Sequence, residues 1–459
     1  LLRSHGPIPI MDHALKMDDE MTYFPRNTFD QCVDFIVSDC QYGIDGALPM
    51  IYTNASGTVA ESLYGRATKA AAYALKARVL LYAASPLFNG NADYAKFANE
   101  DGTLLFAPKD DSKWGKAAAA AKEAIDKIEG SSYYGLYYSD EPDNGYRNYM
   151  ELFLPSKKWN KEYIFARNQG TGYSDNIHQE KCMAANGMGG WSGLCPTQEL
   201  VDAYEMANGS TPIIGYNADG TPIINGASGY SETGFAATAG KHYPAGVYNM
   251  YVGREPRFYA SINFNGQQWR GRQLEFWQGG KDGINVSKVD YCCTGYLLRK
   301  TADEGVDVIN GKGGMKEASI LFRVGSLYLD YAEALNEAEG PVDDVYKYVD
   351  AIRKRAGLPG LAKGLDKDKM RERIQHERQI ELAFEAGHRY FDCHRWKIAE
   401  KTDNGYMHGM NITATNKVDY SKRSTVGDSR VFEKKHYLFP IPQSEMDKRI
   451  GLVQSPYWE

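Results

Sequence analysis

Residues 377–396 read ERQIELAFEAGHRYFDCHRW and place acids, arginines and aromatics three or four residues apart. Side chains at that interval lie along one side of a helix. The charged positions are Glu377, Glu381, Glu385, Arg389, Asp392 and Arg395. Beside them runs an apolar stripe of Ile380, Phe384, Gly387 and Phe391. We expect a helix whose charges either pair with one another inside a helical framework or line a site.

Helical periodicity recurs on both sides of this stretch. It predicts C-terminal helices from residue 321 to about 340, at 343–356 and at 367–388. It also predicts N-terminal helices at 28–41, 66–84 and 112–129, with Thr28 and Ser112 as N-caps. The alanine-rich faces allow close helix approach, as in tetratricopeptide-like helix pairs, although no repeat of about 34 residues can be read.

The segment 131–315 has a different character, because Tyr, Gly, Asn and Trp crowd into it and helical periodicity fades. Only 197–206 reads as a helix, while 257–263 and 291–299 read as short strands. The tail at 436–442 reads as an extended piece fixed by two prolines. The predicted fold is mostly α: a helical scaffold at 1–130, a loop-rich binding region with short strands at 131–315, and a helical region at 316–459. Long ordered loops of this kind are commonly functional.

Composition excludes several classes of protein. The net charge is −6 and the pI is near 5.9, so the chain has no basic field for nucleic acid. The sequence contains no run of about 18 apolar residues, so it predicts no membrane-spanning helix. The seven cysteines are odd in number and lack zinc-site spacing, so neither a metal nor a cofactor is predicted. The first ten residues do not resemble a signal peptide, and we expect that the true N-terminus lies upstream.

Catalytic motifs are not found. The sequence contains neither an HExxH zinc motif nor a GxSxG nucleophile elbow. A glycosidase could use two acids far apart in sequence, but nothing singles out such a pair. The acids of 377–396 stand beside arginines, and ion pairing lowers the pKa of a carboxyl group, which is unsuitable for a general acid. We therefore predict no catalytic residue.

Aromatic and amide side chains of the loop-rich region are the strongest functional signal. Aromatic faces with a polar tip suit sugar rings, and amides or guanidinium groups can bond sugar hydroxyls. The aromatic candidates are Trp191, Tyr216, Tyr230, Tyr243, Tyr248, Tyr251, Trp269 and Trp277, and the polar ones are Asn225, Asn265, Gln267, Gln268, Arg270 and Gln278. The alternative is that the aromatics fill the core of an irregular region. We expect at least two of them to be exposed platforms.

Several ordered motifs together resemble one family. They are HGPIPI at 5–10, GRATKAAAYALKARVLLYAASPLF at 65–88, REPRFYASINFNGQQW at 254–269, TGYLLRK at 294–300, FRVGSLYLDYAEALNEA at 322–338, VDAIRKRAGLPG at 349–360 and the ending YLFPIPQSEMDKRIGLVQSPYWE at 437–459. In this order, with 377–396, they resemble the SusD/RagB family of bacterial outer-membrane nutrient-binding lipoproteins.

The resemblance implies a single SusD-like domain over 1–459 that lacks its N-terminal part. It implies a lipid anchor on an N-terminal cysteine outside this sequence, a place on the extracellular face of the outer membrane, and a SusC-like TonB-dependent transporter as partner. It implies capture of glycans, or in some members of peptides, rather than catalysis. The family's ligand-contacting aromatics lie in variable loops, so the resemblance supplies no site residue.

Four hypotheses follow. The first is a surface glycan-binding protein, the second an oligopeptide-binding member of the same family, the third a glycoside hydrolase and the fourth a plain helical-repeat scaffold. The long 131–315 segment argues against the fourth. The charges of 377–396 are then interpreted as a structural ionic ladder that holds the third C-terminal helix against its neighbours and the 436–442 tail.

Overall fold

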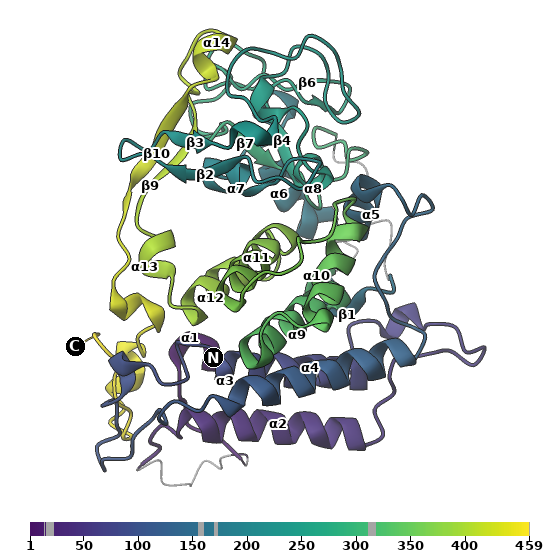
Figure 1. Ribbon diagram of the computed structural model, residues 1–459. Coiled ribbons are helices and arrows are strands. Elements are labelled where there is room, and N and C mark those ends of the chain that lie inside the picture. The colour runs from purple at the N-terminus through teal and green to yellow at the C-terminus, as the bar shows by residue number, and fades with distance from the viewer. Residues whose placement is uncertain (13, 15–22, 155–159, 169–172, 311–317, 459) are drawn as a thin grey trace.

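The computed structural model describes residues 1–12, 14, 23–154, 160–168, 173–310 and 318–458. The chain is mostly helical and has a helical part and an irregular part (Figure 1). Figure 1 shows α2, α3 and α4 side by side at the bottom, α9 to α12 in the middle and the irregular region with short strands at the top. The expected fold class is confirmed.

The first helical layer consists of α2 (Phe29–Asp45), α3 (Lys69–Ala84) and α4 (Ser112–Gly130). Thr28 caps α2 in a reciprocal capping box with Gln31, and Thr68 caps α3 by accepting from Ala71 N. Small residues such as Ala74 and Ala121 are buried where α3 and α4 pack together. These helices confirm the predictions at 28–41, 66–84 and 112–129. The expected cap at Ser112 is wrong, because Ser112 is the first residue of α4 and Asp111 is the N-cap position.

The second helical layer consists of α9 (Val324–Glu339), α10 (Asp343–Arg355), α11 (Lys367–Glu381) and α12 (His388–Arg395). The second agrees with the prediction, and the first agrees except that residues 321–323, expected to be helical, belong to a strand that ends at Arg323. A continuous helix over 367–388 is wrong. The chain leaves the helical conformation after Glu381, because Phe384, Ala386 and Gly387 have φ of 63°, 43° and 71°. Phe384 is therefore 46% exposed and does not belong to an apolar stripe.

Short elements build the irregular region. Its helices include α5 (Gly145–Leu152), α6 (Tyr173–Met183), α7 (Gln198–Ala203) and α8 (Pro256–Ser261), of which the sequence predicted only α7. The strand expected at 257–263 is wrong over most of its length, because Pro256 starts a helical turn and only the end enters β4. Of 291–299, only Tyr296–Leu298 forms a strand.

Antiparallel pairs of strands connect distant parts of the chain. The pairs are β1 (Tyr163–Asn168) with β8 (Ala318–Arg323), β2 (Ile213–Tyr216) with β3 (Pro222–Ile224), β4 (Ile262–Phe264) with β7 (Tyr296–Leu298), β5 (Gln268–Trp269) with β6 (Arg272–Gln273), and β9 (Gly405–Met410) with β10 (Arg423–Arg430). The β9–β10 pair lies in the part expected to be helical, and Figure 1 shows it running up one side to the irregular region.

The irregular region has a hydrophobic core of its own. Val247, Met250 and Phe264 are fully buried there, and Ile380 and Met410 from the C-terminal part join them. The irregular region is therefore well packed, and its hydrophobic core holds the surface loops in position.

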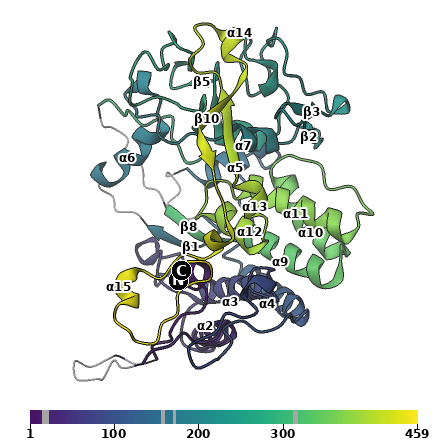
Figure 2. The same ribbon diagram turned by 90° about the vertical axis from the view of Figure 1, so that its left-hand side faces the viewer.

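The first residues of the chain contact its C-terminal tail, and Figure 2 views the molecule from the side on which this tail lies. Phe439 N donates to Ser4 O over 2.7 Å, and Leu438 is buried beside Gly6. The predicted extended tail is only partly found, because Lys434–Tyr437 forms a 3₁₀ turn before the chain extends. The remaining short helices are α1 (Leu2–His5), α13 (Ala399–Thr402), α14 (Lys417–Tyr420) and α15 (Gln443–Met446). None of the helices in the described ranges is both long and apolar enough to cross a membrane.

Candidate ligand-binding site

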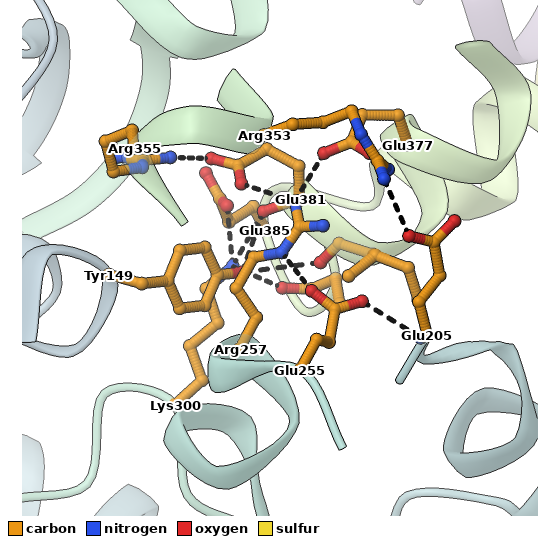
Figure 3. Close-up of polar contacts among 12 residues, drawn as sticks. Tyr149, Glu205, Glu255, Arg257, Lys300, Arg353, Arg355, Glu377, Glu381 and Glu385 are labelled. Carbon is orange, nitrogen blue, oxygen red and sulfur yellow. Dashed lines mark hydrogen bonds and ion pairs between the residues drawn. The ribbon is translucent and has the colours of Figure 1, made fainter. Parts of the chain in front are cut away.

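A buried charge network surrounds Glu381, the last residue of α11 (Figure 3). Its carboxylate pairs with Arg355, with Arg323 over 2.9 Å and with Arg257 over 3.0 Å. Glu381 and Arg355 are fully buried, and the other two guanidinium groups are 1% exposed. Burial alone would raise the pKa of Glu381, but Arg355, Arg323 and Arg257 together lower it to about 2.

The neighbouring acids of α11 and the following turn belong to the same network. Glu377 pairs with Arg353 over 3.1 Å and also contacts Arg257. Glu385 accepts from Arg323 and from Lys300, each over 2.7 Å. The Lys300 ammonium also donates to Ala383 O over 2.8 Å and to Tyr149 Oη over 2.8 Å, and burial lowers the pKa of Lys300 to about 8.

A second group of charges surrounds α12. Arg378 pairs with Asp392 over 2.9 Å and with Asp330 over 2.6 Å. Arg395 donates to Glu333 over 2.6 Å and pairs with Asp392 over 2.9 Å. These ion pairs hold α11 and α12 against α9. The tail contacts α12 through other groups, such as the Tyr390 and Phe439 rings at 6.3 Å.

Arg389 does not belong to this network, contrary to the expectation. It is partly exposed and makes no hydrogen bond or ion pair with any described residue. The reason is the break after Glu381, which rotates α12 away from the line that a continuous helix would follow. The partners Arg257, Arg323 and Arg355 were not predicted, since they lie far from 377–396 in sequence. Every acid of the network faces buried cations, so no carboxylate there is placed to act on a substrate.

Three of the aromatic candidates lie in the core. Tyr230, Tyr251 and Trp269 are 6%, 1% and 2% exposed. Tyr251 packs on Phe264 with ring centroids 4.4 Å apart. The expectation that these three could be surface platforms is wrong, because their faces are covered by the core of the irregular region.

The other five aromatics are accessible but are distributed over the irregular region. Tyr216 is 51% exposed. Trp191 packs beside His178 at 5.4 Å, and Trp277 lies under Lys417 at 5.2 Å. Tyr243 and Tyr248 are partly exposed, and Tyr243 lies parallel to the buried Tyr259 ring at 6.1 Å.

A polar network joins three of the candidate tyrosines. Tyr216 Oη donates to Asp202 over 2.7 Å, and Arg423 makes two bonds to the same carboxylate over 2.7 and 2.9 Å. Arg423 also pairs with Glu232, which accepts from Tyr230 Oη over 2.7 Å through its carboxylate and from Tyr248 Oη through its carbonyl. Tyr216 and Asp202 line a pocket of about 460 Å³ with Glu199, Asp219, Gly220, Thr221, His408, Arg423, Ser424 and Thr425.

Most polar candidates have internal partners. Asn265 accepts from Phe276 N over 2.9 Å, and Asn225 caps a turn by accepting from Ala227 N. Arg270 donates to Glu180 over 2.9 Å and to Asp303 O over 2.7 Å. Gln278 is partly exposed and donates through its backbone to Ala414 O. The side chains of Gln267, Gln268 and Gln278 make no hydrogen bond with a residue that the structure describes, and the first two lie at one place.

Gln267 and Gln268 line a second pocket, of about 330 Å³, between α5 and the 240–244 loop. The full lining is Tyr146, Gly240, Lys241, His242, Tyr243, Pro244, Gln267, Gln268 and Arg299. His242 stacks on Tyr146 with ring centroids 4.7 Å apart and an interplanar angle of 28°. Arg299 lies over the Trp269 ring at 4.8 Å and donates to Tyr146 Oη over 2.6 Å.

This pocket combines ring faces with amide and guanidinium donors, which is the composition expected for a sugar site. The sequence identified Tyr243, Gln267 and Gln268 among its lining residues. It missed Tyr146, His242 and Arg299, because no spacing connects α5, the 240–244 loop and the residues after β7. Within the part of the chain that the structure describes, no three His, Cys, Asp or Glu side chains form a group that could hold a metal ion.

Comparison with known proteins identifies the family. A family model described as "SusD family" matches residues 155–458. The chain is 42% identical over 82 residues to "SusD-like protein P25" of Formosa agariphila, a match that covers 17% of this chain and 15% of that relative.

Solved structures agree over the whole chain. It superimposes on BT4246 with a TM-score of 0.82 and 28% identity, covering 100% of this chain and 81% of that one. It superimposes on a SusD-like protein (BF3747) of Bacteroides fragilis with a TM-score of 0.72 and 28% identity, covering 100% and 76%. The chain described here belongs to the SusD family.

Proposed function

We propose that this protein binds oligosaccharides at the outer face of the outer membrane and passes them to a SusC-like TonB-dependent transporter. The observation that carries the proposal is the pocket between α5 and the 240–244 loop, where stacked rings meet amide side chains that have no hydrogen-bond partner in the described part of the chain. Membership of the SusD family supports it. A lipid on an N-terminal cysteine would tether the protein to the membrane.

Binding would use the ring faces and the amides together. The C–H face of a sugar would stack on His242, Tyr146 or Tyr243, and Gln267 and Gln268 would bond its hydroxyls. His242 already contacts the rings of Tyr146 at 4.7 Å and Tyr259 at 5.2 Å, so its ring is held in place before a ligand arrives. Tyr216 offers a further exposed ring, at the pocket beside Asp202.

A binding role fits the chemistry better than catalysis. The acids of α11 and α12 are buried and ion-paired, and SusD proteins are binding proteins rather than enzymes as a class. Oligopeptide binding is the alternative within the family. The stacked rings favour a glycan, because a peptide groove relies more on hydrogen bonds to an extended backbone.

Isothermal titration calorimetry with polysaccharide and oligopeptide panels tests the proposal. We expect heat with at least one glycan and none with the peptides. His242→Ala should weaken glycan binding several-fold, since an aromatic contact contributes about 0.5–1.5 kcal/mol beyond buried area. Tyr42→Ala is the matched control, because Tyr42 is 84% exposed on α2. Binding of peptides but of no glycan would overturn the proposal, as would release of reducing sugars from a bound polysaccharide.

A further inference from the structure

Arg299, in the pocket between α5 and the 240–244 loop, has N–H donors that no described residue uses. Its side chain is 6% exposed, and Nη2 is engaged by Tyr146 Oη over 2.6 Å and by Glu304 over 3.0 Å. Nε and Nη1 make no hydrogen bond with a described residue, although a guanidinium group carries five N–H donors. The Glu304 side chain is 55% exposed, so solvent screens its attraction for Arg299 and the ion pair is weak.

Gln267 supplies an unused amide at the same place. It is 6% exposed, yet its side chain has no hydrogen-bond partner among the residues that the structure describes, and its Oε1 is buried. Its backbone is fixed by bonds to Phe264 and Leu274. A buried amide oxygen without a partner is uncommon in proteins, and a sugar hydroxyl in the pocket would be able to donate to it.

The charged residues that line the pocket are all positive. It contains Lys241 and Arg299 and no carboxylate. Lys241 is exposed and makes no ion pair with a described residue, and the nearby Glu141 is engaged by Arg147 and Asn144. Burial lowers the pKa of His242 to about 4, and the charges of Lys241 and Arg299 lower it as well. His242 is therefore a neutral ring at pH 7, in a field made positive by its two neighbours.

We propose that this pocket selects negatively charged glycans, with a carboxylate or sulfate ester of the sugar bound by Arg299 beside Lys241 and a neighbouring sugar hydroxyl donating to Gln267. The inference rests on the proposed function and narrows its substrate class. Guanidinium groups bind carboxylates and sulfates through parallel N–H donors. An amide oxygen only accepts, so Gln267 would hold the sugar through a hydroxyl and not through its anionic group. The whole chain carries a net charge of −6, so attraction of an anion must come from this local field.

The matched ligands are an oligogalacturonate, its fully methyl-esterified form and a sulfated galactan oligosaccharide of similar length. The methyl ester removes the negative charge of the carboxylate and keeps the same sugar. Comparison of the oligogalacturonate with the sulfated ligand shows whether the pocket binds a carboxylate, a sulfate ester or both. We expect calorimetry to detect the oligogalacturonate, the sulfated ligand or both, with the methyl ester at least about tenfold weaker than its acid if that acid binds. Binding should weaken with added salt.

Lys241→Gln should weaken binding of the charged ligand by roughly three- to tenfold, because one exposed charge contributes modestly. Lys127→Gln on α4 is the control, since Lys127 is exposed and unpaired in the described part of the chain. Arg299→Gln should abolish detectable binding, and thermal melting separates this loss from unfolding.

The inference is overturned if the methyl ester binds as tightly as the acid, or if Lys241→Gln behaves like Lys127→Gln. Binding of neutral glycans alone would also overturn it and leave the proposed function standing. Binding of peptides and of no glycan would overturn both.

Discussion

Glu381 and Arg355 form an ion pair in which neither side chain is exposed to solvent. Arg323 and Arg257 approach the same carboxylate from β8 and α8. One acid thus connects three segments that are far apart in sequence. Replacing it by an isosteric amide would leave buried cations short of a counter-charge.

We predict that Glu381→Gln lowers the free energy of unfolding by about 3–5 kcal/mol, as expected when one member of a buried ion pair is removed. Urea denaturation measures this value. Glu445→Gln removes an exposed partner of Lys448 and should change stability by less than about 1 kcal/mol. If Glu381→Gln kept full stability and lost ligand, the network would be part of the binding site.

Arg395 and Arg389 provide a matched pair on α12. Arg395→Ala should cost about 3–5 kcal/mol, because Glu333 and Asp392 both lose a buried cation and are left to share Arg378. Arg389→Ala should change stability by no more than about 0.5 kcal/mol, since Arg389 has no partner in the described chain. Thermal melts of both variants measure the difference. Equal losses would show that the break in the helix does not separate the two arginines.

The ionisation of Glu381 should make the stability of the protein depend on pH in the acidic range. Its pKa is lowered from 4.5 to about 2 in the folded chain. The folded state therefore binds fewer protons than the unfolded state between these values, and stability falls as the pH drops from about 4.5 to 2. The shift corresponds to about 3 kcal/mol, an order-of-magnitude value. The difference in unfolding free energy between the wild type and Glu381→Gln should shrink over this range, and a constant difference would contradict the assignment.

Gly145 is needed where α5 meets the end of α10. A Cβ at this position would lie 2.2 Å from the carbonyl oxygen of Ala356. Gly145→Ala should therefore destabilise the protein by about 1–3 kcal/mol and disturb the neighbouring Tyr146 in the pocket. Gly115→Ala in α4 meets no atom within 4 Å and should stabilise the protein by about 0.5–1 kcal/mol. Opposite signs in the two denaturation curves are the expected result.

Local signals in the sequence were sufficient for the long helices. Thr28 and Thr68 mark helix starts, and Gly340 and Gly357 follow helix ends, so α2, α3, α9 and α10 were predictable. The break after Glu381 was not, because Phe384 and Ala386 adopt positive φ against their intrinsic preference. Glu385, which lies between them, pairs with Arg323 and Lys300, and these come from segments that sequence spacing does not connect to it.

The sequence predicted the types of residue that form the candidate site, but only some of the residues that line it. The aromatic and amide composition indicated the correct region, and Tyr243, Gln267 and Gln268 lie in the pocket. Burial could not be read from residue type, since Tyr251 and Tyr216 are both tyrosines in the same region but are 1% and 51% exposed. Arg299 and Tyr146 come together only because α5 packs beside the residues that follow β7.

Arg299 and Lys300 are adjacent in sequence, and both donate to tyrosines of α5, Arg299 to Tyr146 and Lys300 to Tyr149. Arg299 lines the pocket, while Lys300 is fixed by the carbonyls of Glu381 and Ala383 at the end of α11. The backbone that presents Arg299 is thus held by the helical scaffold before any ligand arrives. Preorganisation of this kind lowers the entropy lost on binding, so affinity for a charged sugar would depend on how firmly Lys300 is held.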